Sequence, residues 1–242
     1  MFEYVERNLL QVLESRPGGL HPAKVRLFTW QLVKAVAACH ARGVAHRDVK
    51  PENILVSRDG ETLKLCDFGF ARVLPSRRAP EDAERLSGAD ENAAPRMARA
   101  RDENDRKNDE PKNAPLTEYV ATRWYRAPEL LCLSHSYGAA VDLWSTGCIL
   151  AEMILRAPLM AGNDYLNQLQ LIIQTLGTPT DAEMATLENE HARQYVRRLP
   201  EQKAKSWEEV MPHATPAARA LLRKLLVFDQ AKRLPAAQAL HD

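Results

Sequence analysis

The 242-residue sequence is poor in cysteine and lacks any long apolar run. Its four cysteines are widely spaced without a C-x-x-C pair, so neither a structural zinc site nor a disulfide framework is expected. No stretch approaches the roughly 18 consecutive apolar residues of a membrane span, and the first residues show no basic region followed by an apolar run. We therefore expect no membrane partner, a reducing compartment, and a location in the cytoplasm, the nucleus or both.

An excess of charge of one sign is also absent. The 33 Lys and Arg residues nearly balance the 32 Asp and Glu residues, which gives a formal net charge of +1. This balance argues against nucleic-acid binding driven by bulk charge, and we expect no nucleic-acid partner. A hydrophobic content of 45% over this length is enough for one domain with a sizeable core.

The apolar pattern predicts a mainly α-helical fold with one short β-hairpin. Apolar residues recur three and four positions apart in residues 9–13 and 22–42, and Gly43 can end the second helix in a left-handed conformation. Further helices are expected at residues 143–155, 165–176 and 216–228. Short apolar runs at residues 54–56 and 63–66, separated by a turn that includes Asp59-Gly60, indicate the hairpin.

Residues 77–113 differ from the rest of the chain. Nine Lys or Arg and ten Asp or Glu residues are mixed there with Ala, Asn and Pro, and Leu86 and Met97 are the only large apolar residues. Such a segment buries too little apolar surface to offset its ordering entropy, so we expect it to be disordered. It is either a tolerated surface insertion or a regulatory or docking loop.

The most specific motif is His46-Arg47-Asp48-Val49-Lys50-Pro51-Glu52-Asn53, which Asp67-Phe68-Gly69 follows 14 residues after Asn53. This order and spacing match a phosphoryl-transfer site. In such a site the first Asp accepts the substrate hydroxyl proton, while the Asn and the second Asp hold Mg²⁺ on the nucleotide phosphates. The alternative interpretation, ordinary turn residues, fits the combined spacing poorly.

Further motifs extend the pattern. Ala127-Pro128-Glu129 follows the segment Thr117-Glu118-Tyr119-Val120-Ala121-Thr122-Arg123-Trp124-Tyr125-Arg126, and Asp142-Leu143-Trp144 opens an apolar helix. With these motifs the chain resembles a eukaryotic protein kinase of the CMGC group. Residues 2–10 and 64–72 resemble the cyclin-dependent-kinase-like branch, whereas residues 161–179 and 226–229 resemble mitogen-activated protein kinases. The subfamily is left open.

The resemblance implies roles for individual residues. Asp48, Lys50, Asn53 and Thr122 would be catalytic, and Asn53 and Asp67 would be the Mg²⁺ ligands. ATP would contact Glu3 and Val5 in a hinge, Leu55 beneath the adenine, and Asp67. Thr117 and Tyr119 would be phosphorylated by an upstream activating kinase, and Arg47, Arg123 and Arg126 would receive those phosphates, although such arginines are also found as plain solvated charges. Glu129 and Arg233 would form a buried ion pair.

Two parts of such a kinase have no candidate in the sequence. No G-x-G-x-x-G occurs, and Lys24 and Lys34, the only lysines before Lys50, fall on a predicted helix rather than on a strand. We therefore expect residues 1–242 to be a partial kinase domain, a hinge plus the C-terminal lobe, without the small β-rich N-terminal lobe. Two functions follow: a Ser/Thr kinase acting on protein substrates, possibly at Ser/Thr-Pro sites, or a catalytically silent lobe that docks substrates or regulators.

Overall fold

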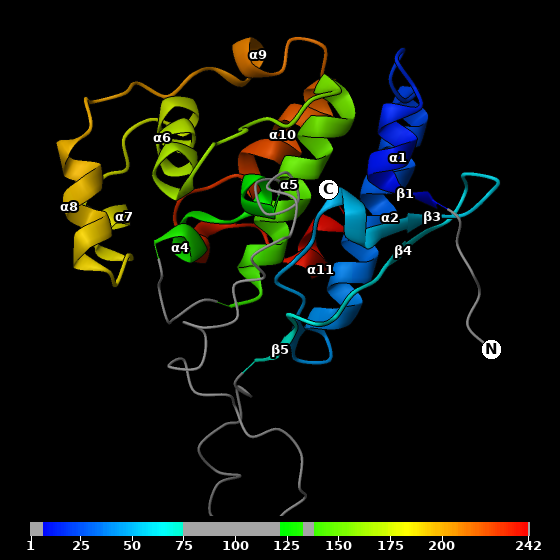
Figure 1. Ribbon diagram of the computed structural model, residues 1–242, viewed down its shortest axis with the longest axis horizontal. Coiled ribbons are helices and arrows are strands. Elements are labelled where there is room, and N and C mark those ends of the chain that lie inside the picture. The colour runs from blue at the N-terminus through cyan, green and yellow to red at the C-terminus, as the bar shows by residue number, and fades with distance from the viewer. Residues whose placement is uncertain (1–6, 75–121, 133–137, 242) are drawn as a thin grey trace, which may run out of the picture.

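The computed structural model describes residues 7–74, 122–132 and 138–241, and these parts are mainly helical (Figure 1). The predicted insertion at 77–113 lies outside the described residues. The helices are α1 (Leu9–Glu14), α2 (Pro22–His40), α4 (Pro128–Leu131), α5 (Ala140–Leu155), α6 (Tyr165–Leu176), α7 (Asp181–Ala185), α8 (Glu190–Arg198), α9 (Trp207–Val210), α10 (Pro216–Leu225) and α11 (Ala236–Ala239), with 3₁₀ turns η1 (Pro51–Asn53), η5 (Thr122–Tyr125) and η6 (Gln230–Lys232).

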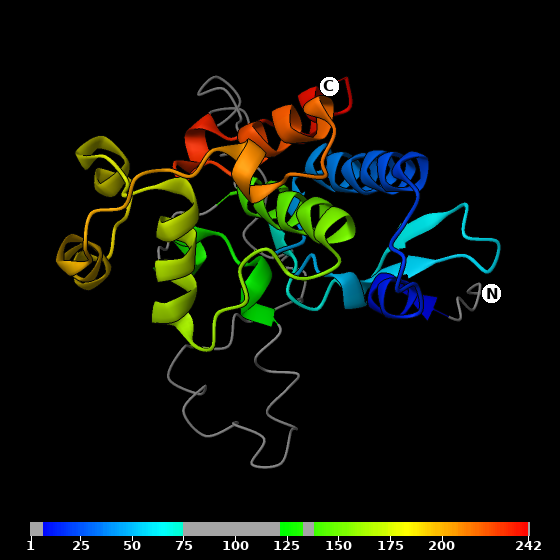
Figure 2. The same ribbon diagram turned by 90° about the horizontal axis from the view of Figure 1, so that it is seen from above.

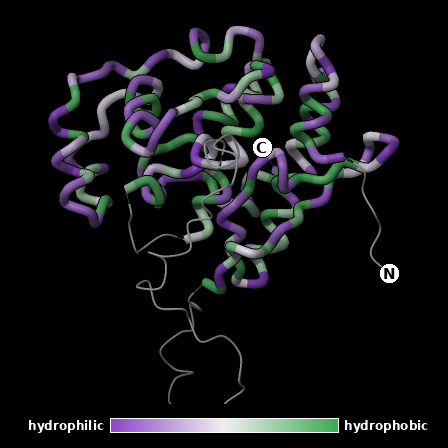
Figure 3. Tube along the Cα trace, in the orientation of Figure 1, coloured by the Kyte–Doolittle hydropathy of each residue, from purple (hydrophilic) through white to green (hydrophobic). Residues whose placement is uncertain are grey.

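Helix α5 is the centre of the core. Its residues 141–153 are all buried, and Trp144 and Ile149 are fully enclosed. Helices α2 and α10 pack against it, and α11 packs against α2. Figures 1 and 2 show the β-hairpin and α1 at one end of the molecule and α7 and α8 at the other. Hydrophilic residues predominate along the outlying α8, whereas hydrophobic ones gather around α5 (Figure 3).

Side-chain caps and glycines mark several of the helix ends. The His21 Nδ1 atom accepts a hydrogen bond from the Ala23 amide at the start of α2, and Gly43 has φ 69° just after its end. Helix α6 has the predicted bounds, and Gly177, with φ 90°, ends it. Three predicted helix ends were wrong: α2 stops at His40 rather than at Arg42, α5 begins at Ala140 rather than at Leu143, and α10 stops at Leu225 rather than at Phe228.

The short strands form two small sheets. The predicted hairpin is confirmed: β3 (Ile54–Val56) pairs antiparallel with β4 (Leu63–Leu65), and β1 (Arg7–Asn8) pairs with the other edge of β3. The turn contains Gly60 at φ 72°, a conformation that glycine adopts without steric cost. The second sheet pairs β2 (Val44–Ala45) with β5 (Arg72–Val73). Together the two sheets flank the segment that carries the motif at residues 46–53.

In the described ranges, no helix combines the length and the apolar character needed to cross a bilayer.

Candidate active site

The segment at residues 46–53, which we call the catalytic loop, leaves β2 and enters η1. Its first two backbone amides, those of His46 and Arg47, donate to the two carboxylate oxygens of Asp142 at 2.8 and 2.7 Å. Arg47 has φ 71°, which allows consecutive amides to converge on one anion. His40 Nε2 lies 2.8 Å from the same carboxylate, which is fully buried. Asp142 therefore anchors the loop from the first turn of α5.

Sequence reasoning gave no role to Asp142 or His40. The available signal was an aspartate inside a helix that is apolar on most faces. A buried carboxylate is stable only where several donors satisfy it, so its position alone indicates a structural partner elsewhere in the chain.

Asp48 is held from two directions inside the loop. Its carboxylate Oδ2 atom lies 3.1 Å from Lys50 Nζ and 2.9 Å from Asn53 Nδ2, and the same amide nitrogen also donates to the Asp48 carbonyl at 2.9 Å. The Asp48 residue is 8% exposed. The structure thus brings together Asp48, Lys50 and Asn53, three residues of the predicted phosphoryl-transfer motif, and fixes the orientation of the carboxylate.

The loop at Asp67 is joined to the catalytic loop by backbone and ring contacts. The Cys66 amide donates to the Asn53 carbonyl at 2.9 Å, and His46 Nε2 lies 2.9 Å from the Cys66 carbonyl. The rings of Phe68 and His46 are in an edge-to-face contact, with 4.8 Å between their centroids. Asp67 has φ 62° and accepts a hydrogen bond from the Gly69 amide at 3.2 Å. These contacts hold the backbone at Cys66 beside the backbone at Asn53, so Asp67 and Asn53 lie on neighbouring loops.

These residues fit a Mg²⁺ site only in part. No cluster of three or more His, Cys, Asp or Glu side chains suited to a metal occurs within the described ranges. Asn53 uses its amide nitrogen for both hydrogen bonds to Asp48, which leaves its amide oxygen for a cation, and Asp67 offers a carboxylate. One amide oxygen and one carboxylate suit Mg²⁺ when phosphate oxygens and water complete its octahedral shell.

Several predicted site residues are not described or are described in part. Glu3, Val5, Thr117 and Tyr119 lie outside the described residues. Thr122 begins η5, and its catalytic role remains a prediction. Leu55 is half-buried on β3, where it pairs with Asn8 and Lys64 across the sheet.

The segment after Thr122 is tied to α5 by a buried pair that sequence reasoning missed. The Tyr125 hydroxyl donates a hydrogen bond of 2.7 Å to Glu152 Oε2, and the Tyr125 carbonyl accepts one of 2.7 Å from Ser145 Oγ. Burial raises the pKa of Glu152 to about 7, and the nearby Glu52 carboxylate adds to this shift, whereas the Tyr125 hydrogen bond opposes it. Burial and the Glu152 carboxylate in turn raise the pKa of the Tyr125 hydroxyl.

Two of the three predicted phosphate-receiving arginines lie at one place. Arg123 and Arg126 both lie near the ring of Tyr165, with guanidinium carbons 5.3 and 5.6 Å from its centroid. Arg123 Nη1 donates to the Asn163 carbonyl at 2.7 Å, and Arg126 Nη1 donates to the Tyr165 hydroxyl at 2.7 Å. The third, Arg47, belongs to the catalytic loop.

The predicted ion pair between Glu129 and Arg233 is present and buried. Arg233 Nη1 lies 2.7 Å from Glu129 Oε1 and Nη2 lies 3.0 Å from Oε2, a bidentate arrangement. The side chains are 0% and 4% exposed. Arg233 also donates to the carbonyls of Val227, Phe228 and Ala140. Helix α10 ends before the predicted position because the backbone leaves the helical conformation at Leu226, with φ −94° and ψ 67°.

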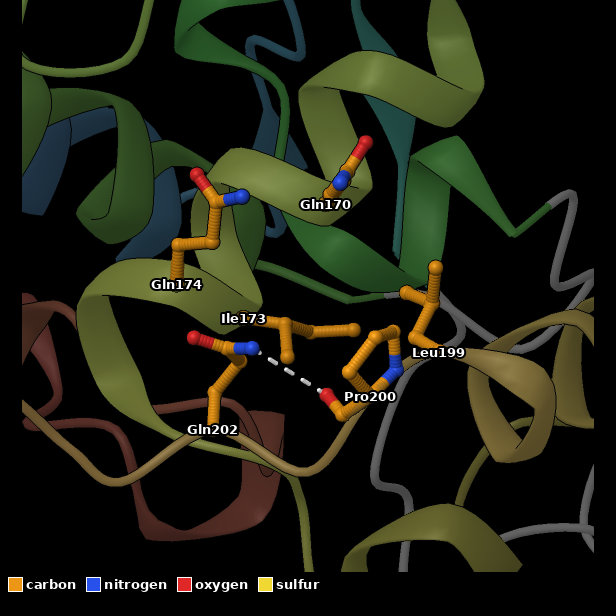
Figure 4. A pocket seen from close by; sticks show the side chains of 6 residues that line it. All are labelled: Gln170, Ile173, Gln174, Leu199, Pro200 and Gln202. Carbon is orange, nitrogen blue, oxygen red and sulfur yellow. Dashed lines mark hydrogen bonds between the residues drawn. The ribbon is translucent and has the colours of Figure 1, made fainter.

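A cavity of about 160 Å³ lies away from the catalytic loop, between α6 and the segment that follows α8 (Figure 4). Its lining residues are Gln170, Ile173, Gln174, Leu199, Pro200 and Gln202. Within it, Gln202 Nε2 donates to the Pro200 carbonyl at 3.3 Å. None of the lining residues belongs to the catalytic loop or to the Asp67-Phe68-Gly69 segment, so this cavity has no part in the candidate active site.

Comparison with known proteins agrees with the family resemblance that the motifs indicated. The family model described as "Protein kinase domain" matches residues 1–242. The chain is similar to "Mitogen-activated protein kinase 3" of Oryza sativa subsp. japonica, with 36% identity over 240 residues, 99% of this chain and 55% of the relative. It is also similar to "Mitogen-activated protein kinase spk1" of Schizosaccharomyces pombe, with 39% identity over 238 residues, 98% of this chain and 55% of the relative.

A third relative shows similar coverage. "Mitogen-activated protein kinase 2" of Pneumocystis carinii is 38% identical over 238 residues, 98% of this chain and 58% of the relative. The chain therefore spans little more than half the length of the curated relatives it matches.

Proposed function

Because the chain belongs to the protein kinase family and is similar to mitogen-activated protein kinases, we propose that it transfers a phosphoryl group from ATP to Ser or Thr hydroxyls of protein substrates. The observation that supports this most is the Asp48 carboxylate, which Lys50 and Asn53 hold in one orientation. Catalysis of phosphoryl transfer depends mainly on positioning and on electrostatic stabilisation, which is what such a fixed carboxylate and ammonium provide.

Asp48 acts on the substrate hydroxyl in this proposal. Its Oδ2 atom is engaged by Lys50 and Asn53, so Oδ1 is the oxygen that accepts the hydroxyl proton. A carboxylate serves because it is an acceptor at neutral pH and lies within hydrogen-bond reach of a bound hydroxyl. Lys50 offsets negative charge that develops on the equatorial oxygens of the transferred group.

Asn53 and Asp67 would hold Mg²⁺, and the bound cation would neutralise part of the negative charge of the nucleotide phosphates. Leu55 would form the floor beneath the adenine, with Glu3 and Val5 as hinge residues. Substrates with Ser/Thr-Pro sites, an upstream kinase that acts on Thr117 and Tyr119, and a cytoplasmic or nuclear location belong to the same proposal, on the strength of the names of the relatives.

A second candidate function is a lobe that docks protein partners without phosphoryl transfer. The two lysines that precede the catalytic loop in the described residues both lie on α2. Lys24 pairs with Glu61, and the Lys34 ammonium lies 4.8 Å from the Trp30 ring centroid. Neither is placed on a strand to contact nucleotide phosphates, and this observation favours the second function for the isolated chain.

Titration of the purified 242-residue chain with ATP and Mg²⁺ separates the two functions. For a kinase we expect a rise in melting temperature on nucleotide binding and phosphorylation of a Ser-Pro peptide. Asp48→Asn should lower turnover by about a hundredfold or more, because the general base is lost, while leaving the fold intact.

Asp181→Asn is the matched control, because Asp181 is an exposed residue at the start of α7, outside the candidate site. It should retain full turnover. Turnover by the Asp48→Asn variant equal to that of the parent chain would refute the proposed role of Asp48. The absence of any thermal shift at millimolar nucleotide would favour the docking function.

A further inference from the structure

Tyr165, the first residue of α6, is in contact with both arginines that we expect to receive a phosphate. Its hydroxyl accepts a hydrogen bond of 2.7 Å from Arg126 Nη1, and both guanidinium groups lie within cation–π distance of its ring. Tyr165 itself is 38% exposed, so it lies at the edge of the molecule rather than in the core. Sequence analysis gave this residue no role.

The charges at this place are not balanced by the described residues. In ranges 7–74, 122–132 and 138–241, neither Arg123 nor Arg126 forms an ion pair with a carboxylate, and their polar contacts are the Asn163 carbonyl and the Tyr165 hydroxyl. Arg123 is only 8% exposed, and its Nε atom is buried without a hydrogen-bond partner. Two neighbouring guanidinium groups with an unused buried donor favour the binding of an anion.

The Tyr165 hydroxyl is a neutral acceptor in the position where an anion would bind Arg126. A phosphate monoester carries three acceptor oxygens and nearly two negative charges at pH 7, so it satisfies two guanidinium groups better than one hydroxyl does. We propose that Tyr165 is a placeholder, whose hydroxyl occupies the site formed by Arg123 and Arg126 until a phosphorylated tyrosine displaces it from Arg126. The ring then remains as an apolar wall beside both arginines.

This inference rests on the proposed phosphate-receiving role of Arg123 and Arg126, but it does not depend on phosphoryl transfer by the chain. It implies that removing the Tyr165 hydroxyl strengthens phosphate binding, because Arg126 then has no hydrogen bond to give up. A residue that merely contributes to the phosphate site would have the opposite effect when it is truncated.

Phenyl phosphate is a suitable probe, and its binding can be followed by ³¹P NMR titration of the whole chain at constant ionic strength. Tyr165→Phe keeps the ring and removes only the hydroxyl, and we expect it to bind phenyl phosphate about fivefold more tightly than the parent chain. Arg126→Gln should abolish binding. Tyr195→Phe, which removes the hydroxyl of a tyrosine on α8, is the matched control and should bind like the parent.

Unchanged or weaker binding by Tyr165→Phe would overturn the placeholder role alone. If neither the parent chain nor Tyr165→Phe binds the probe, the phosphate-receiving role of the two arginines is wrong as well, whatever the outcome of the ATP titration. A chain prepared with phosphotyrosine at position 119 separates two sources of the ligand. Loss of probe binding assigns the phosphate to the chain itself, and retained binding assigns it to a partner, and either result is consistent with displacement of Tyr165.

Discussion

Replacing Arg233 with methionine removes the positive charge that faces the buried carboxylate of Glu129. The pair is bidentate, at 2.7 and 3.0 Å, and its two side chains are 0% and 4% exposed, so water cannot replace the lost partner. A buried charge left in this state costs about 3–5 kcal/mol. We therefore expect the free energy of unfolding of Arg233→Met to be lower than that of the parent chain by this amount.

The opposite truncation should cost less. In Glu129→Gln the arginine still donates to the carbonyls of Val227, Phe228 and Ala140, and the amide oxygen can accept one of the lost hydrogen bonds. The expected loss is about 1.5–3 kcal/mol, the range for hydrogen bonds to charged groups. In the double variant the two losses should not add, and we expect a coupling free energy of about 1–3 kcal/mol.

Urea unfolding at pH 7 measures all three values, provided that the denaturant slope does not change between variants. Lys232→Met is the matched control, because this side chain is 60% exposed and its contact with Asp229 is 3.7 Å long, so a change of no more than about 0.5 kcal/mol is expected. A loss of less than about 1 kcal/mol in Arg233→Met, or losses that add in the double variant, would refute the reasoning that the pair is buried and coupled.

Two further predictions concern groups around α5. Because burial raises the pKa of Glu152 to about 7 from its ordinary 4.5, the folded chain binds this proton more tightly than the unfolded chain. Stability should therefore fall by up to about 3 kcal/mol as pH rises through this window, and Glu152→Gln should remove that dependence in urea unfolding, whereas an unchanged pH profile would contradict it. Asp142→Asn should cost about 2–3 kcal/mol and accelerate amide exchange at His46 and Arg47, because an amide cannot accept all three donors. Exchange equal to that of the parent chain would show that the anchor is not needed.

Local signals in the sequence were sufficient to predict α1, the four longest helices and the hairpin. The bounds of α6 follow from its amphipathic pattern and from Gly177, and the hairpin follows from two apolar runs around Asp59-Gly60. Each of these signals depends on residues that are close together in the sequence, so it can be recognised without knowledge of the fold. The end of α10 does not follow in this way, because no Gly or Pro marks Leu226, where the backbone leaves the helical conformation.

The same distinction applies to the candidate site. Asp48, Lys50 and Asn53 are close in sequence, so one loop can bring their side chains together. The contacts of Asp142 with the catalytic loop and of Tyr165 with Arg126 join residues on different elements, and nothing in either local sequence specifies its partner. Only the packing of α5 and α6 against the rest of the fold brings these groups together.

The hydrogen bonds from the catalytic loop to Asp142 depend only weakly on the number of residues between the two segments. Arg47 and Asp142 are 95 positions apart in sequence, so their hydrogen bond closes a large loop. The entropy cost of closing a flexible loop grows only with the logarithm of its length, and doubling the length adds about 0.6 kcal/mol. The charged stretch at 77–113 lies within this interval, and insertions there therefore have little thermodynamic effect on how the catalytic loop is held.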